Sequence, residues 1–391
     1  MKLRNIAAIA LCAVMLAAAT GCSDKTDKTS PDEPSPPTIS EPSNQEPSPS
    51  EETPDGSDNY GIDYDAAFAA FAPDTVMISA GDYAVTWDEL FFNIRSNIDG
   101  VIQNFGEIDD WSEIVYDGMS FADLILNYAS ENAMMYKTVS FGADQVGAAL
   151  SPEDIDSMKE EYETAIEQYG GEEGFLKEVW EQNSISSLEL YNYLSSTRYL
   201  VNAIFNLLYG ENGEMVTDED VAAFTAADGY LMAKHILRMR PEEGEDTALV
   251  EIEEILEQLD SYDGEDFEAF FDELMYEYTD DGDGLMWFPN GYLFQYGDMV
   301  QEFYDACIAL EVGAYSGIVE TSYGYHILYR EPIGFDEIPY YYFRQGNYTT
   351  LRNIATLGMF DSAMYGWLDS LTPVYTDEYR SIDLLEIFNL N

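Results

Sequence analysis

His235 and His326 are the only two histidines in the chain, and imidazole is the side chain best suited to proton or hydrogen-bond chemistry near neutral pH. Each lies in a short apolar run, 233–237 and 324–328, of the kind that predicts a β-strand. A single histidine in a strand is more often a core residue with satisfied hydrogen bonds than a catalytic one. Two histidines that open and close one compact segment favour a shared site.

A metal site is the main alternative for these histidines, and the sequence argues against it. No histidine, cysteine or carboxylate cluster has the close spacing of a zinc site. The acidic loop 280–284 also fails the calcium-loop pattern, because position 5 counted from Asp281 is Leu285 and position 12 is Tyr292. We therefore expect no bound metal.

The elements that must position the histidines follow an α+β pattern over residues 229–333. Strands are predicted at 230–240, 316–321 and 324–329, and helices at 247–259, 266–278 and 298–310. Residues 64–228 are predicted to be helical after one hairpin at 76–85, with helix starts at Thr86, Ser151, Ser186 and Thr217. Residues 334–391 are predicted to return to helix. The expected fold is a small antiparallel sheet with surrounding helices, inserted between an all-helical N-terminal region and a C-terminal helix that packs back on it.

The first 63 residues have the pattern of a targeting segment rather than of a folded domain. Lys2 and Arg4 precede an apolar stretch at 6–19 that is short for a bilayer span, and small residues then lead to Cys22. This arrangement resembles the lipobox of bacterial lipoproteins, so residues 1–22 are predicted to be a signal peptide and Cys22 the lipidated residue. An ordinary signal peptide in which Cys22 has no role is the alternative. Residues 23–63 are rich in Pro, Ser and Glu and are expected to form a disordered tether.

The charge of the chain limits its partners. It has 16 basic and 76 acidic residues, a formal net charge of −60. Such a protein is not expected to bind nucleic acid, or an anionic membrane face through its body. Solubility alone accounts for most of this charge. Cys307, the one cysteine after Cys22, lies in an apolar helical pattern and is expected to be a core residue.

Three ordered blocks carry a family resemblance. Residues 234–237 (Lys-His-Ile-Leu) resemble the opening strand of the parvulin rotamases, Trp287 to Phe303 resembles their central Trp-Phe…Gly-x-Met…Phe segment, and 319–327 resembles their closing Thr-x-x-Gly-Tyr-His-Ile. Two departures accompany the match. Residues 283–286 read Asp-Gly-Leu-Met where the family often has Gly-Asp-Leu-Gly, and the eight residues 289–296 form a longer aromatic loop, expected to cover the slot or widen its specificity.

The resemblance implies a peptidyl-prolyl cis/trans isomerase that needs no cofactor. The rotation makes no bond, so the site requires an apolar slot for the proline ring rather than a nucleophile. Leu285, Met299 and Phe303 would form that slot, with Met299 and Phe303 on one face of a helix. The implied catalytic group is His235, Asp281, Thr321 and His326, and Tyr323 would border the pocket. The acidic loop after Arg240 lacks the basic cluster of phosphate-directed parvulins.

The order of the segments resembles extracytoplasmic foldases of the PrsA and SurA type. It implies a lipid-anchored foldase whose partners are unfolded, newly secreted polypeptides with X–Pro bonds; whether it forms a dimer stays open. The alternative is a catalytically weak chaperone that binds clients through its helical region. A solute-binding lipoprotein would require α/β lobes, which the sequence does not predict.

Overall fold

The computed structural model describes residues 61–241 and 246–390. They divide into two compact units: unit 1 comprises 61–204 with 363–390, and unit 2 comprises 205–362. The predicted signal peptide, Cys22 and all but the last residues of the predicted tether lie outside the described residues. In the two described stretches, no helix is long and apolar enough to cross a membrane.

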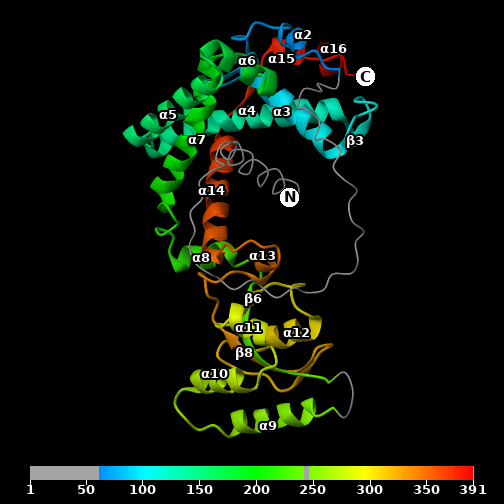
Figure 1. The fold of residues 1–391 in the computed structure, drawn as a ribbon, viewed down its shortest axis with the longest axis vertical. Coiled ribbons are helices and arrows are strands. Elements are labelled where there is room, and N and C mark those ends of the chain that lie inside the picture. The colour runs from blue at the N-terminus through cyan, green and yellow to red at the C-terminus, as the bar shows by residue number, and fades with distance from the viewer. Residues whose placement is uncertain (1–60, 242–245, 391) are drawn as a thin grey trace. The chain divides into compact units, whose positions relative to one another are not determined.

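Unit 1 is mainly helical (Figure 1). A hairpin of β1 (Val76–Ala80) and β2 (Tyr83–Thr86) pairs with β9 (Val374–Tyr375), and β3 (Ile114–Tyr116) pairs with β4 (Met119–Ser120). Its helices are α2 (Tyr64–Phe68), α3 (Trp87–Phe105), α4 (Phe121–Val146), α5 (Pro152–Gln168), α6 (Glu172–Asn183), most of α7 (Leu188–Tyr209), the end of α14 (Leu351–Ser370), α15 (Asp377–Arg380) and α16 (Leu384–Ile387).

The C-terminal segment completes the core of unit 1. Phe91 of α3 stacks on Phe388 at a centroid distance of 5.3 Å and on Trp180 of α6 at 6.1 Å. Leu371 and Leu384 are buried in the same apolar cluster. The chain therefore returns to its N-terminal helices, and the predicted α+β architecture with a returning C-terminal segment is confirmed.

Helix starts were predicted with mixed success. The capping boxes at Thr86, Ser151 and Thr217 are present, each with a carboxylate at the third helical position that accepts the N–H of the capping residue. The start at Ser186 is wrong by one residue. The N–H of Leu190 donates to Oγ of Ser187 at 3.1 Å, so Ser187 provides the cap of α7.

Unit 2 contains a four-stranded antiparallel sheet in the order β6-β5-β8-β7. The strands are β5 (Leu231–Met239), β6 (Tyr292–Phe294), β7 (Val319–Glu320) and β8 (Gly324–Glu331). Its helices are α8 (Asp218–Thr225), α9 (Ala248–Ser261), α10 (Phe267–Tyr278), α11 (Gly282–Trp287), α12 (Gln301–Ala309), α13 (Tyr340–Arg344) and the start of α14.

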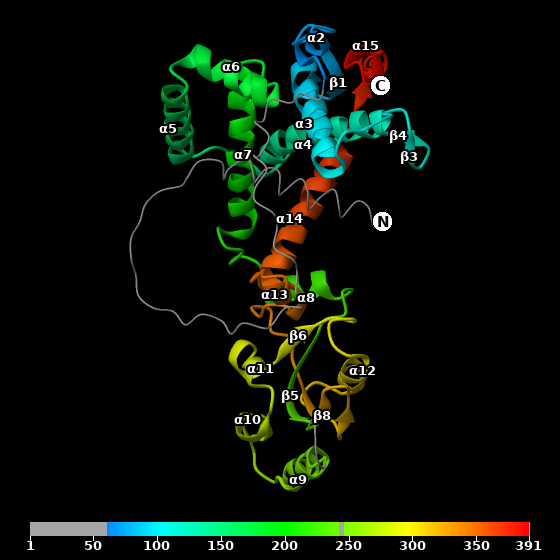
Figure 2. The ribbon, with the colours of Figure 1, turned by 45° about the vertical axis from the view of Figure 1, so that its right-hand side comes forward.

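The sheet has an apolar cluster on each face because side chains alternate along a strand. Ile236 and Ile327 pack with α9 and α10, whereas Ala233 and Leu328 pack with Phe303 and Cys307 of α12. Figure 2 shows α10 and α12 on opposite sides of β5 and β8. The sheet is thus covered on both faces, which explains why β5 and β8 read as continuous apolar runs.

Unit 2 is wider than the segment 229–333 expected from sequence. One apolar cluster joins Met232 and Leu293 of the sheet with residues outside that segment. These are Val216, Val221 of α8, and Leu351 and Ala355 of α14. The helix predicted at 298–310 is also shorter, since α12 begins at Gln301. Strand β6 was not predicted, because three residues at a sheet edge give little periodicity.

Arg95 of α3 provides a test of how unit 1 is held together. Its buried guanidinium donates to the carbonyl of Trp180 and to Oγ of Ser184, both at 2.9 Å, at the C-terminal end of α6. Arg95→Met leaves these acceptors without a partner, so we expect a loss of about 2–4 kcal/mol in the free energy of unfolding of unit 1. Denaturant unfolding followed by circular dichroism measures it.

Arg198→Met is the matched control. Arg198 forms an ion pair with Glu161 on the surface, and we expect its loss to cost less than about 1 kcal/mol. Equal losses in the two variants would contradict the role assigned to Arg95.

Candidate active site

Strand pairing brings the two histidines together from positions 91 residues apart. In the β5–β8 register, His235 lies opposite Leu328 and Leu237 lies opposite His326, so the two imidazoles are diagonal neighbours on one face. Their rings are stacked with centroids 5.2 Å apart. Both residues are buried, and the site is therefore built into the sheet rather than onto a loop.

A chain of hydrogen bonds runs through the histidines. Nδ1 of His235 lies 3.0 Å from Nδ1 of His326, and Nε2 of His326 lies 2.8 Å from Oγ1 of Thr321. At the other end, Nε2 of His235 lies 2.8 Å from Oδ2 of Asp281. The backbone N–H of Tyr323 donates to Oγ1 of Thr321 at 3.1 Å. The structure thus joins all four residues of the catalytic group that the resemblance implied.

One arrangement of protons satisfies every contact when both imidazoles are neutral. Asp281 only accepts, so Nε2 of His235 carries the proton and Nδ1 of His235 is the acceptor. Nδ1 of His326 must then donate to it, which leaves Nε2 of His326 to accept from the hydroxyl of Thr321. Thr321 in turn accepts from the N–H of Tyr323. The chain is directional and ends on the carboxylate.

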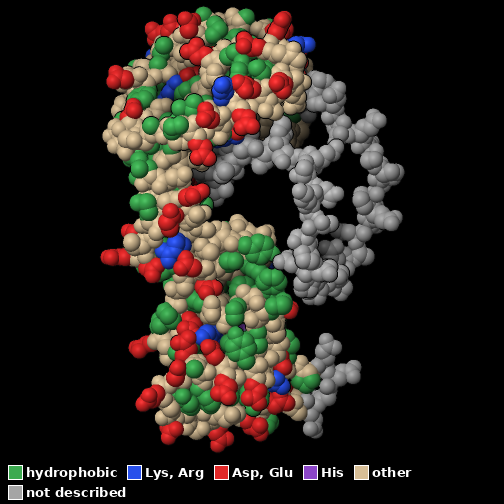
Figure 3. Space-filling view, turned by 60° about the vertical axis from the view of Figure 1, so that its left-hand side comes forward, with side chains coloured by type: hydrophobic (Ala, Val, Ile, Leu, Met, Phe, Trp, Pro, Cys, Tyr) green, Lys and Arg blue, Asp and Glu red, His purple; other side chains and the backbone are tan. Residues whose placement is uncertain are grey.

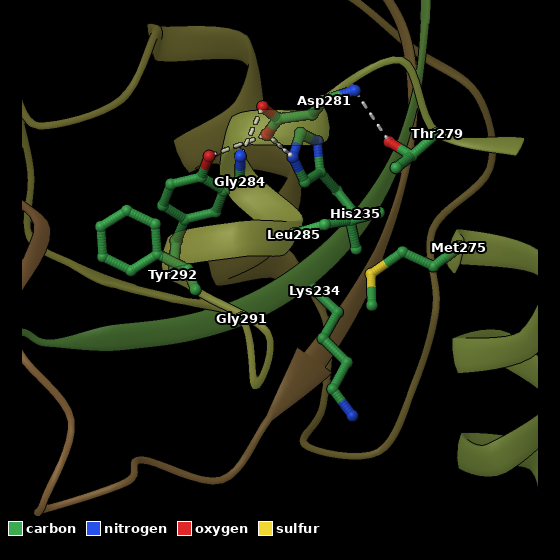
Figure 4. A pocket seen from close by; sticks show the side chains of 10 residues that line it. Lys234, His235, Met275, Thr279, Asp281, Gly284, Leu285, Gly291 and Tyr292 are labelled. Carbon is green, nitrogen blue, oxygen red and sulfur yellow. Dashed lines mark hydrogen bonds and ion pairs between the residues drawn. The ribbon is translucent and has the colours of Figure 1, made fainter. Parts of the chain in front are cut away.

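Asp281 is held by more than His235 (Figure 4). It is the N-cap of α11, and its Oδ1 accepts the backbone N–H of Gly284 at 3.0 Å. Its Oδ2 also accepts the hydroxyl of Tyr292 at 2.7 Å. Three donors from three elements therefore fix this carboxylate at the edge of the site.

The electrostatics follow from burial and from these bonds. Burial of Asp281 acts to raise its pKa, but the hydrogen bond and charge of His235, with the bonds from Tyr292 and Gly284, lower it to about 2. The pKa of His326 is lowered to about 3, first by burial and then by the charge of His235. At neutral pH the site thus presents one ionised carboxylate above a neutral buried His326.

Phe303 and Met299 lie on the histidine face of the sheet. The ring of Phe303 packs edge-on against both imidazoles, at 5.4 Å from His235 and 5.7 Å from His326. Met299 packs against the same apolar cluster. However, Met299 precedes the first residue of α12, so the argument that it shares a helix face with Phe303 is wrong. Packing of the segment before the helix places it there.

Leu285 and Tyr323 lie elsewhere around the site. Leu285 packs against the apolar cluster on the opposite sheet face and lines a hollow with His235, Asp281 and Tyr292 (Figure 4). The structure therefore does not group Leu285 with Met299 and Phe303 in one cluster. Tyr323 directs its backbone N–H to Thr321, while its side chain is exposed.

Tyr292 is the residue that sequence reasoning missed. Its ring packs edge-on against His235 at 5.6 Å, and its hydroxyl reaches Asp281. Gly291 makes this approach feasible, because it has φ +101° and a Cβ there would lie 2.8 Å from the backbone of Ala233. The extra aromatic residues at 289–296 were the available signal, but residues 292–294 within this segment form strand β6 beside β5.

The arrangement suits chemistry that makes no covalent bond. Cys307, on the same sheet face, is buried, and burial raises the pKa of its thiol to about 11, so it is a poor nucleophile. The site offers an apolar wall, one fixed carboxylate and a hydrogen-bonded imidazole pair.

The state of His326 can be tested by NMR on the full chain. Because its folded-state pKa lies far below the 6.5 of an unfolded histidine, its ring signals should not titrate between pH 5 and 8. We expect the tautomer protonated at Nδ1, read from the ring ¹⁵N shifts. His326→Gln assigns the signals, since the chain has only one other histidine. A midpoint near 6.5, or a proton on Nε2 with Nδ1 bare, would contradict the proposed proton arrangement.

Comparison with known proteins identifies a family that matches the segment containing this site. Residues 235–332 match the family described as Rotamase, PPIC-type PPIASE domain. No curated protein sequence matches the chain.

Three solved structures illustrate the wider similarity. PrsA from Bacillus cereus is 18% identical with a TM-score of 0.29, covering 81% of this chain and 99% of that one. PrsA from Bacillus subtilis is 20% identical with a TM-score of 0.25, and the match covers 73% of this chain and 99% of that one. A SurA-like chaperone of Campylobacter jejuni is 20% identical with a TM-score of 0.22, and the match covers 67% of this chain and 99% of that one.

TM-scores of this size support no further inference, and the assignment rests on the match over 235–332. Residues 235–332 are therefore a parvulin-type peptidyl-prolyl cis/trans isomerase domain.

Proposed function

We propose that this protein is a foldase that acts outside the cytoplasmic membrane and isomerises X–Pro bonds in unfolded, newly secreted polypeptides. The observation that carries the proposal is the hydrogen-bonded group of Asp281, His235, His326 and Thr321 beneath the ring of Phe303, within the isomerase domain. Unfolded chains are the natural substrate, since a proline bond must be accessible to enter the site.

The proposed mechanism uses shape and a fixed charge. Rotation about an X–Pro bond has a barrier of roughly 20 kcal/mol and takes roughly tens to hundreds of seconds without catalysis. Phe303 and Met299 would hold the proline ring on the apolar side of the site. The Asp281 carboxylate would lie beside the prolyl carbonyl and favour the twisted amide, in which resonance no longer spreads charge onto the oxygen. His235, His326 and Thr321 would act as positioning residues that keep the floor of the site rigid.

The proposed location rests on the sequence of the first 63 residues. A basic start, a short apolar stretch and small residues before Cys22 support export and lipidation of that cysteine. The Pro-, Ser- and Glu-rich segment 23–63 would then separate the folded units from the membrane. Contact with the membrane would occur through the lipid alone.

A chaperone that depends mainly on unit 1 is the second candidate. Phe105, Ile114 and Tyr116 are apolar or aromatic side chains with exposed fractions of 72%, 61% and 45%, and such surfaces are suited to unfolded clients. This function needs no isomerase activity, so the two candidates differ in what a mutation of the isomerase site does.

The first experiment measures X–Pro exchange in short unphosphorylated peptides by NMR, with the full chain as catalyst. We expect acceleration, and Met299→Ala should lower kcat/KM by about tenfold or more, because it removes part of the apolar wall for the proline ring. Met239→Ala is the matched control, since Met239 is 49% exposed at the end of β5 and outside the site.

The outcomes separate the candidates. A folded wild-type chain that gives no acceleration would reject the isomerase-based function and leave the chaperone of unit 1. Acceleration that Met299→Ala and Met239→Ala reduce equally would reject the proposed slot.

A further inference from the structure

A continuous set of aromatic rings leads from the active site of unit 2 to its surface. We call it the aromatic surface; it consists of Trp287, Phe288, Tyr292, Tyr340, Phe343 and Tyr348. The first three belong to α11 and the chain that follows it, and the others to α13 and the turn after it. Two segments separated by about half of the isomerase domain thus meet beside the catalytic group.

The rings contact one another in sequence. Tyr292, which packs on His235, stacks on Phe288 at 4.6 Å, and Phe288 packs edge-on against Phe343 at 4.8 Å. The ring centroid of Phe343 lies 5.4 Å from that of Trp287 and 5.7 Å from that of Tyr348. A peptide seated at Asp281 therefore lies next to the inner end of this path.

The outer end of the path is open. The exposed fractions are 51% for Trp287 and 62% for Tyr348. Figure 3 shows hydrophobic side chains gathered on one face of unit 2, at the level of α11 and α13, among acidic side chains. Exposed aromatic faces that adjoin a catalytic site favour contact with the substrate over plain packing.

The charge of unit 2 indicates which substrate. Acidic residues greatly outnumber its basic ones, which are Lys234, Arg238, Arg240, Arg330, Arg344 and Arg352.

Most of these cations are already used inside the unit. Lys234, Arg238, Arg240 and Arg352 each pair with two or more carboxylates, and Arg330 donates to backbone carbonyls near the end of α12. They therefore do little to offset the charge that a peptide meets at the site.

Carboxylates act on the inner rings of the aromatic surface. After burial, the charge of Asp281 is the largest cause that raises the pKa of Tyr292, and Asp283 adds to it. A cation already lies on one of these rings, since Cζ of Arg344 stands 5.7 Å from the centroid of Tyr340. Aromatic faces in a negative field attract cations both through their quadrupole and through the carboxylates.

We propose that the aromatic surface is a subsite for a lysine or arginine side chain that flanks the proline of the client. The inference deepens the proposed isomerase function and rests on it. The indole of Trp287 would supply the main face, because tryptophan binds cations best among the aromatic side chains. An aromatic or aliphatic neighbour would gain contact with the rings but nothing from the charge.

The test compares peptides that differ at one residue before or after proline, with lysine, norleucine, phenylalanine or glutamate at that position. With the full chain, we expect kcat/KM for lysine to exceed that for norleucine by about three- to fivefold in at least one of the two sets. Glutamate should be slowest. Raising the salt from about 0.1 M to about 1 M should reduce the lysine advantage, because the Debye length falls from about 10 Å to about 3 Å.

Two variants locate the effect. Trp287→Ala should bring the lysine-to-norleucine ratio toward one, whereas Arg344→Gln should raise it by removing a competing cation from Tyr340. Tyr276→Ala is the matched control, since Tyr276 is 57% exposed on α10, away from the aromatic surface, and should leave the ratio unchanged.

The outcomes distinguish failure of the proposed subsite from failure of the proposed isomerase function. Norleucine or phenylalanine peptides turned over as fast as lysine peptides would overturn the subsite while the isomerase function stands. If no peptide is isomerised, the proposed isomerase function is rejected. The subsite is then tested by binding alone, from the NMR signal of the Trp287 indole N–H as peptide is added. A shift with lysine peptides but not with norleucine peptides supports it, and equal shifts or none reject it.

Discussion

The antiparallel pairing of β5 with β8 is the constraint on which the rest of unit 2 depends. Side chains alternate along a strand, so a slip of one residue in this register would send His326 to the opposite face from His235. The register also separates the two apolar clusters that cover the sheet. One set of backbone hydrogen bonds therefore decides both the core and the site.

The site is held rigidly because each polar group in it has a partner. Asp281 accepts from His235, Tyr292 and Gly284, and the histidine pair ends on Thr321. Buried polar groups are costly when unpaired, so a satisfied chain of this kind also specifies one conformation. On the opposite face, Lys234 is satisfied in the same way by Glu331 at 2.8 Å and by two further carboxylates.

Aromatic residues surround the polar groups of the site. Within the segment 289–296, edge strand β6 brings Tyr292 to Asp281, and α13 places Tyr340 and Phe343 beside it. These residues set the surroundings of the histidine pair without entering its chain of hydrogen bonds, except through Tyr292 on Asp281. Differences in client choice within one catalytic design are expected to arise in such surroundings, because discrimination by kcat/KM reflects contacts next to the reacting bond.

The sequence by itself determined the segments and much of the chemistry. Short apolar runs located β5 and β8, the helical pattern of apolar residues located α9 and α10, and three motif blocks identified the isomerase domain. These features are local, so short stretches of chain encode them. Tertiary structure decided the rest. It places Met299 in the segment before α12, packs Leu285 against the apolar cluster on the face opposite the histidines, and brings the hydroxyl of Tyr292 to Asp281. Each of these positions depends on packing between segments distant in sequence, which no local pattern records.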